Sequence, residues 1–336
     1  MAEGSLLDVA CDESGSDGEN LTGGNTDVFA HASVRLPMAV AAGCVREIRD
    51  RIRSPAEEYK ANHLLREKHR AVLEWLLSPA GPLYGHAHVH LTEKAFFVVD
   101  RALGVLLGDP AEAATLYRTG PAAFGEEPWR TFLEAANHLL RVRHTADPAA
   151  PVDDFLRAVA ALRALPCDPH VAATLARLAG SRARAGSFRT RTLQGPAVAP
   201  LLNPLLPAIV RTAAHWSAHG APVRLVHDQQ NMLTADRVAW IVRTARQEGV
   251  RLTGLELVDS RQDPRVQLAD FLAGIARKLA SDELNRRGEA ELTALLRPYA
   301  GASSVWGDAA SWARLGPPAH GPGPAARPGA ASPTPC

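Results

Sequence analysis

Cysteine is scarce in this chain of 336 residues and forms no close pair. The four copies are Cys11, Cys44, Cys167 and Cys336. Because no two of them are spaced as CxxC, the sequence predicts neither a zinc ribbon nor a disulfide framework. Free thiols are typical of a reducing compartment, so a cytoplasmic location is expected.

Long apolar runs are also missing. No stretch approaches the roughly 20 apolar residues that span a bilayer, so no membrane partner is expected. The first residues are acidic rather than basic, unlike those of a secretory signal. The chain also lacks the GxSxG elbow of serine hydrolases and the glycine-loop lysine of P-loop ATPases.

The net charge is only +1, but one segment lacks basic residues and another lacks acidic residues. Residues 1–34 contain seven acids and no Lys or Arg, whereas residues 169–227 contain seven arginines and no acid. The nearly neutral total argues against a protein that coats nucleic acid, but the second segment suits an anionic partner.

Three apolar segments from distant parts of the chain each end in an acid. Leu6–Gly15 delivers Asp12 and Glu13, VRLVHD ends in Asp228, and LELVD ends in Asp259. Each segment predicts a β-strand followed by turn residues. Carboxylates gathered at strand ends predict a site for Mg²⁺ or Mn²⁺, because hard oxygen ligands suit these ions.

A further acid, Asp270, lies inside the apolar segment 266–276, which predicts a buried helix. A buried carboxylate needs an arginine, a hydrogen-bonding cage or a metal ion. Beside the strand-end acids, a metal ion is the preferred partner. Taken singly, each of these acids is more often a turn or capping residue, so the prediction depends on their joint pattern.

Strands alternate with helices near both ends of the chain, which predicts an α/β domain. Residues 1–93 and 201–300 would form its two halves, with an all-helical insertion at 94–200 between them. Further strands are expected at 28–34, 86–91, 223–228 and 255–259, and helices outside the insertion at 37–53, 64–77, 204–219, 234–248 and 263–279. Helices in the insertion are expected at 94–107, 111–117, 128–142, 153–165 and 170–178. No pattern is evident after Gly301, and the Pro, Gly and Ala content of residues 316–336 predicts a disordered tail.

Histidines alternate in HAHVHL, residues 86–91, so that a strand would carry His86, His88 and His90 on one face. Such a row suggests zinc, but a strand spreads the three rings over roughly 13 Å. A half-exposed polar face is the preferred interpretation.

Arginines recur in the segment 180–191, which is expected to be a loop. They are Arg182, Arg184, Arg189 and Arg191. Together with Gly, Ser and one Phe, they would either bind a phosphate backbone or remain solvated, and the sequence does not decide between the two.

Several of these motifs together resemble one known family. They are DESG at 12–15, Glu58-x-Lys60, the strand-end Asp228, and Asp259-Ser260 followed by QLADFLAG at 267–274. The chain is similar here to the family named domain of unknown function 3800, and QLADFLAG is the most specific part. The resemblance covers both ends of residues 6–280, while the helical middle carries none of its motifs. It implies a ribonuclease H-like fold, which is a mixed five-stranded sheet flanked by helices with an acidic two-metal site.

The resemblance also implies roles for individual residues. The acids implied as both catalytic and metal-binding are Asp12, Glu58, Asp228 and Asp270. Asp12 would bridge two ions of Mg²⁺ or Mn²⁺, with Glu13 and Asp259 as reserve ligands. Lys60 would contact a substrate phosphate or the developing charge.

The reaction that follows is metal-dependent hydrolysis of phosphodiester bonds in a nucleic acid. The alternative is a non-catalytic nucleic-acid-binding or regulatory module on the same fold. Its affinity for nucleic acid would survive the loss of Asp12 and Asp228.

Overall fold

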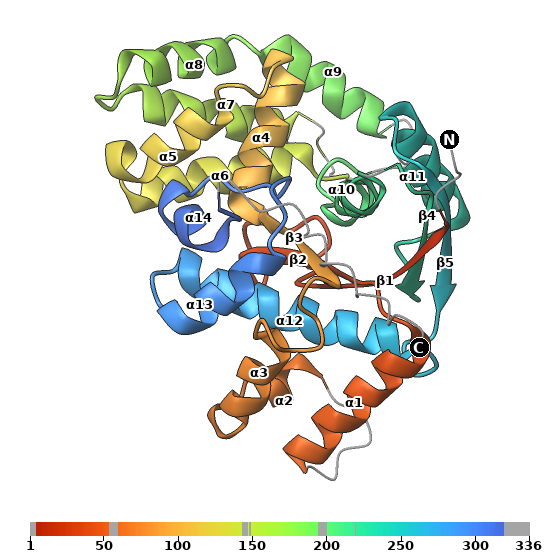
Figure 1. Ribbon diagram of the computed structural model, residues 1–336. Helices are drawn as coiled ribbons and strands as arrows, with labels where there is room; N and C mark the ends of the chain where they lie inside the picture. Colours follow the sequence, from red (N-terminus) through yellow and green to blue (C-terminus); the bar gives the residue numbers. More distant parts are fainter. Residues whose placement is uncertain are drawn as a thin grey trace, which may run out of the picture.

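A five-stranded mixed sheet lies at the centre of the protein (Figure 1). The computed structural model describes residues 5–53, 60–142, 147, 149–193, 200–218 and 220–318. The strands are β1 (Leu7–Ser14), β2 (Val28–Val34), β3 (Ala87–Glu93), β4 (Val223–Asp228) and β5 (Leu252–Val258). Their order is β3-β2-β1-β4-β5, with β2 antiparallel to β1 and β3, and with β4 parallel to β1 and β5. The central strand β1 therefore joins the antiparallel half of the sheet to the parallel half.

Helices cover both faces of the sheet (Figure 1). One face carries α12 (Pro264–Leu284), which packs on β1 and β2, with α1 (Met38–Ile52) and α2 (Ala61–Leu64) on the outer side of α12. The other face carries α10 (Leu205–Ser217) and α11 (Ala235–Gln247). The chain is thus an α/β protein with an open mixed sheet flanked by helices, as the sequence predicted.

Local sequence explains where the central helix α12 begins. The side chain of Asp263 caps the helix by accepting a hydrogen bond from Arg265 N at 2.8 Å, and Pro264 occupies the first turn. Most side chains of α12 are buried, because the helix lies between the sheet on one side and α1 with α2 on the other. The helix continues to Leu284, beyond the predicted end at residue 279.

A helical body lies beside the sheet, between β3 and α10 in the chain (Figure 1). It consists of α4 (Lys94–Leu107), α5 (Ala113–Phe124), α6 (Glu126–Leu140), α7 (Ala150–Arg163), α8 (Pro169–Ala179) and α9 (Arg182–Leu193). It has its own apolar core, in which Phe97, Phe132 and Phe155 are buried. The helices predicted between residues 94 and 178 are all present. Most bounds differ by up to three residues, but α5 continues to Phe124, seven residues beyond its predicted end at 117.

Two predictions about local structure are wrong. The segment 180–191 is not a loop but forms most of α9, since Arg and Ala are good helix formers and Ala185 is buried against the helical body. The predicted helix 64–77 is broken into α2, the short 3₁₀ turn η1 (Glu67–His69) and α3 (Arg70–Leu77). Arg66 is extended there, with φ −73° and ψ 138°, so Leu64 and Leu76 both reach the core.

The segment after Gly301 is also more ordered than expected. It follows α13 (Ala290–Leu296) and η2 (Arg297–Tyr299) and contains α14 (Ala309–Leu315), whose first turn is capped by the Asp308 side chain. Of the predicted tail, residues 319–336 lie outside the described residues. Among the helices of the described ranges, none combines the length and the apolar character that a membrane span needs.

Candidate functional site

A small apolar cluster determines which face of the sheet carries three of the predicted acids. Its buried members are Ala10 on β1, Val226 on β4 and Val266 on α12. Side chains two residues further along a strand, or four further along a helix, return to the same face. Asp12, Asp228 and Asp270 follow at these spacings, so they converge beyond the cluster.

Electrostatics agrees with this convergence. Asp12 is only 7% exposed. Burial raises the pKa of its carboxyl well above the usual value, and the charges of Glu13, Asp270 and Asp228 raise it further. Asp228 on β4 and Asp270 on α12 are therefore close enough to Asp12 to repel its charge, and a cation would stabilise Asp12.

The β4 acid is oriented by the turn after β5. Ser260 N donates to Asp228 Oδ1 at 3.0 Å, and Gln267 Nε2 donates to Ser260 O at 2.9 Å. The Asp-Ser pair and the first residue of QLADFLAG thus act through the backbone of Ser260 to hold Asp228. Motifs far apart in the sequence are thus in contact at the end of β4.

Lys60 reaches the site from the other side of α12. Its Nζ lies 3.3 Å from Asp270 Oδ2, and the two side chains are 49% and 20% exposed. The approach depends on Gly274, because a Cβ there would lie 2.3 Å from the Cβ of Ala61. The glycine of QLADFLAG therefore allows α2 to pack on α12 and brings Lys60 to Asp270.

The Ser and Gly of DESG have structural roles. Gly15 has φ +90°, and a Cβ there would lie 2.4 Å from Val28 O. Ser14 Oγ accepts a hydrogen bond from Arg277 Nε at 3.1 Å. The tight turn ends β1 shortly after the two acids and so leaves them at the carboxyl end of the central strand.

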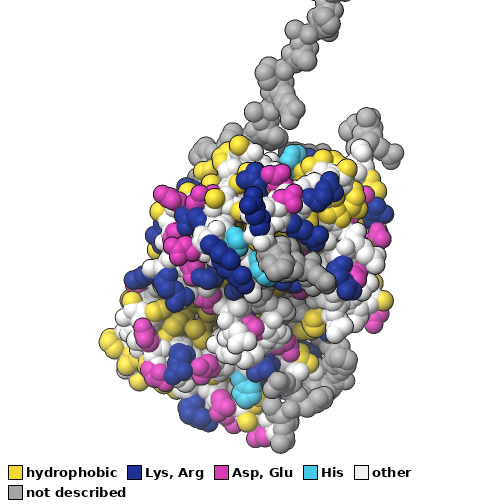
Figure 2. Space-filling view, turned by 90° about the horizontal axis from the view of Figure 1, so that it is seen from below, with side chains coloured by type: hydrophobic (Ala, Val, Ile, Leu, Met, Phe, Trp, Pro, Cys, Tyr) yellow, Lys and Arg dark blue, Asp and Glu magenta, His cyan; other side chains and the backbone are white. Residues whose placement is uncertain are grey.

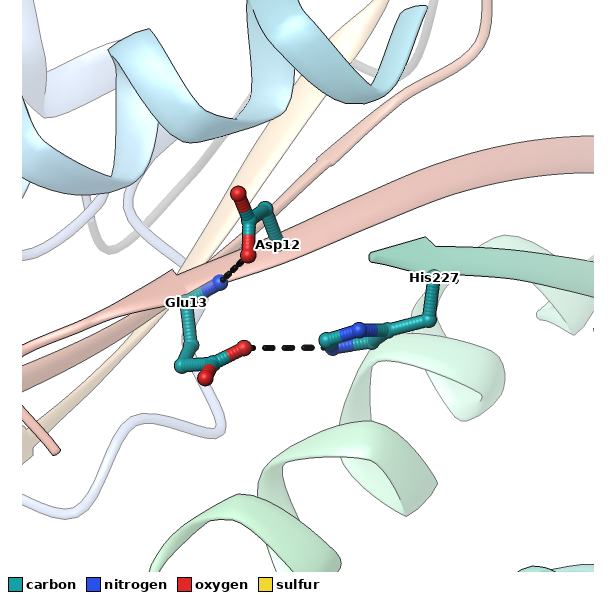
Figure 3. Close-up of side chains that lie close together, drawn as sticks. All are labelled: Asp12, Glu13 and His227. Carbon is teal, nitrogen blue, oxygen red and sulfur yellow. Dashed lines mark hydrogen bonds and ion pairs between the residues drawn. The ribbon is translucent and has the colours of Figure 1, made fainter. Parts of the chain in front are cut away.

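Glu13 and a histidine that the sequence analysis missed lie next to Asp12. Glu13 Oε2 is 3.5 Å from Nε2 of His227 on β4 (Figure 3). One ligand atom each from Asp12, Glu13 and His227 lies within 4.8 Å of the other two. The available signal was the alternation of VRLVHD: His227 follows Leu225 at a spacing of two, so it was bound to share that residue's buried face.

One predicted acid of the described residues, Asp259, has a different partner. Asp259 instead pairs with Arg261, whose Nη2 lies 2.8 Å from Asp259 Oδ2, and the ion pair lowers the pKa of Asp259. Glu58 lies outside the described residues. Its place in the site stays a prediction.

The row of histidines on β3 is neither a zinc triad nor a half-exposed face. His88 and His90 are buried, whereas His86 precedes the strand and is exposed. The ring of His88 stacks on His215 of α10 with centroids 3.8 Å apart, and His90 pairs in register with His31 of β2. Because α10 covers this face, two histidines belong to the interior and the third does not join them.

One arginine of the predicted nucleic-acid contact is buried. Arg189 is 2% exposed, and its Nη1 donates to the carbonyl oxygens of Leu139 and Arg141 at 3.3 and 2.5 Å. It ties α9 to the end of α6 and is not available to a polynucleotide. The prediction is wrong for this residue.

The other three arginines on α9 have different surroundings from Arg189. Arg182 Nη1 lies 2.7 Å from Asp153 Oδ1, and Arg184 Nη1 donates to Leu106 O at 3.0 Å. Arg191 is exposed. Two of the three therefore hold α9 against its neighbours, and contact of these residues with nucleic acid stays a prediction.

No protein-family model matches the chain, and no curated protein or solved structure matches it either. The chemistry of the residues is therefore the basis for a function. Three convergent carboxylates with a lysine beside them offer oxygen ligands for cations and a positive charge for an anionic substrate.

Proposed function

We propose that the protein is a divalent-metal-dependent nuclease with a ribonuclease H-like fold, which hydrolyses phosphodiester bonds at the edge of the sheet next to Asp12. The observation that supports this most is the placement of Asp12, Asp228 and Asp270 on one face of the sheet. An open mixed sheet with five strands and helices on both faces is also the architecture that the sequence resemblance implies.

The residues fit Mg²⁺ or Mn²⁺. Both ions prefer oxygen ligands, and Asp12, Asp228 and Asp270 supply carboxylates from three different elements. When bound, the ions would activate water and stabilise the leaving oxygen of the phosphodiester. Lys60 is half exposed beside Asp270, so its ammonium group can contact a substrate phosphate while α2 holds its backbone.

A basic surface suits the anionic substrate. In the view from below, Lys and Arg side chains gather over the middle of the molecule (Figure 2). The elements lowest in Figure 1 are α1, α2 and α3, and the exposed basic residues there include Arg46, Arg49, Arg66 and Lys68. Lys60 belongs to the same part of the chain, and its side chain is 49% exposed beside Asp270, so it would add a positive charge for an anionic substrate next to the acids.

The test compares Mn²⁺ binding and cleavage in matched variants. Calorimetric titration and a panel of RNA, DNA and hybrid substrates would be applied to the wild type and to an Asp12→Asn, Asp228→Asn double variant. We expect saturable Mn²⁺ binding and cleavage in the wild type and neither in the double variant. Asp8→Asn is the matched control, because Asp8 lies on the same strand but pairs with Arg224 at 2.8 Å.

Two results would contradict the proposal. Cleavage that persists in the double variant would remove the acids from the chemistry. Nucleic-acid binding without cleavage, equal in the wild type and the double variant, would identify the non-catalytic module instead.

A further inference from the structure

Glu13 and His227 form a buried polar pair on the face of the sheet that α10 covers. His227 is fully buried, and the Glu13 side chain is 14% exposed. Within the part of the chain that the structure describes, Glu13 Oε2 and His227 Nε2 are buried and neither has a hydrogen-bond partner. They nevertheless face each other at 3.5 Å. Two buried polar atoms without partners are costly, so their alignment needs an explanation.

The other nitrogen of His227 indicates which proton the ring carries. His227 Nδ1 lies 3.0 Å from the backbone oxygen of Asp228. A carbonyl oxygen can only accept, so Nδ1 carries the hydrogen and donates it. In the neutral ring Nε2 then presents a lone pair toward the carboxylate of Glu13. A metal-ligating histidine typically has this arrangement, with its second nitrogen bonded to a carbonyl or carboxylate.

The spacing fits a metal ion between the two atoms. For bonds of about 2.1 Å at a tetrahedral angle, ligand atoms lie about 3.4 Å apart. The observed separation of Glu13 Oε2 and His227 Nε2 is 3.5 Å, which matches this geometry. An oxygen of Asp12 lies within 4.8 Å of the ligand atoms of both residues and would have to move closer to bind the same ion, because two ligands with such bonds are at most about 4.2 Å apart. We infer that Asp12, Glu13 and His227 bind a borderline transition-metal ion of the Zn²⁺ class, with one coordination position open.

The donor set separates this site from the one that the proposed function uses. An imidazole nitrogen suits Zn²⁺ rather than Mg²⁺, which prefers oxygen ligands. Glu13 Oε2 is buried and faces the ring nitrogen of His227 at 3.5 Å, so a cation between the two atoms would compensate the buried carboxylate. The two sites share Asp12, but Glu13 and His227 serve only the second, and the inference does not depend on nuclease activity.

The test uses Co²⁺ as a spectroscopic probe in the full-length protein. We expect one Co²⁺ ion with the visible absorption of a four-coordinate nitrogen and oxygen site, displaced by Zn²⁺. Binding should weaken at least tenfold in Glu13→Gln and in His227→Phe. It should persist in His90→Phe, the matched control, because His90 is an equally buried histidine of the same sheet. It should also persist in an Asp228→Asn, Asp270→Asn double variant that has lost Mn²⁺-dependent cleavage.

NMR of the histidine ring nitrogens in the wild-type protein provides a readout that needs no variant. We expect the Nε2 signal of His227 to change when Zn²⁺ is added. A protonated Nε2 that Zn²⁺ leaves unchanged would show that His227 simply donates to Glu13 and would overturn the inference. Unaltered Co²⁺ binding in His227→Phe would do the same, whatever the outcome of the nuclease assays.

Discussion

Gly274 is where α2 touches α12, and replacing it tests how Lys60 reaches the acids. A Cβ at this position would lie 2.3 Å from the Cβ of Ala61, so Gly274→Ala forces the two helices apart. Because Lys60 directly precedes Ala61, the shift would also move its ammonium group away from Asp270. The variant should therefore lose stability and weaken the Lys60–Asp270 ion pair together.

The magnitude follows from two opposing effects. Overpacking of a core costs about 1–3 kcal/mol, and so short a contact is at the upper end of that range. Replacing glycine by alanine within a helix contributes about 1 kcal/mol in the other direction. We expect a net loss of about 2 kcal/mol in the free energy of unfolding.

Urea denaturation of four variants would measure this effect: Gly274→Ala, Ala61→Gly, the double variant that combines them, and Gly104→Ala. Gly104→Ala is the matched control, because Gly104 lies within α4 and a Cβ there would meet nothing within 4 Å. That variant should gain about 0.5–1 kcal/mol. The Gly274→Ala, Ala61→Gly double variant should recover most of the lost stability, giving a coupling energy of about 1–2 kcal/mol. A stabilised Gly274→Ala variant, or the absence of coupling, would refute the packing of α2 on α12.

Two further perturbations test buried charges. Lys94→Met should lower the free energy of unfolding by about 3–5 kcal/mol, because Asp17 would lose the buried partner of its carboxylate. Burial raises the pKa of Asp17, but hydrogen bonds from Lys94 and Thr26 lower it more, to below 3.8. In an acid titration followed by circular dichroism, the wild type should therefore keep the stability from this pair above pH 3.8 and lose it on further acidification. A stability difference between Lys94→Met and the wild type that does not change with pH would contradict this prediction. In chemical denaturation, Arg189→Met should lower the free energy of unfolding by about 1–3 kcal/mol, because it leaves carbonyl groups unpaired. The control Arg191→Met, at an exposed position, should change it by less than about 0.5 kcal/mol. Equal effects of the two substitutions would show that Arg189 is not buried.

Short apolar segments that end in turn residues were sufficient to predict the sheet. The bounds of β2 and β4 coincide with the predicted strands 28–34 and 223–228. The alternation of small and β-branched residues with a polar stop encodes each strand locally, so no distant contact is needed to recognise it. The order of the strands depends on packing between distant segments, and the sequence analysis did not predict it; the resemblance implied only that the sheet is mixed and has five strands.

The segment 180–191 shows where local reasoning fails. Its Gly, Ser and Arg content is typical of a solvated loop, but the surface of the helical body selects α9. Burial of Arg189 depends on carbonyl groups at the end of α6 that are left free by the helix itself. These carbonyl groups lie about 50 residues before Arg189 in the sequence, and no residue pattern near Arg189 indicates them.

The candidate site shows the same division between local and distant information. Asp12 and Glu13 are consecutive residues of β1, and the sequence analysis treated both as ligands of one acidic site. In the structure the Glu13 side chain instead faces His227 (Figure 3). His227 on β4 is the register partner of Cys11 on β1. Alternation makes the two faces of a strand different environments, so adjacent acids meet different partners. Asp12 thereby lies between the carboxylates of Asp228 and Asp270 on one side and His227 on the other, so in the two proposals the selectivity for a metal ion would depend on which set the ion contacts.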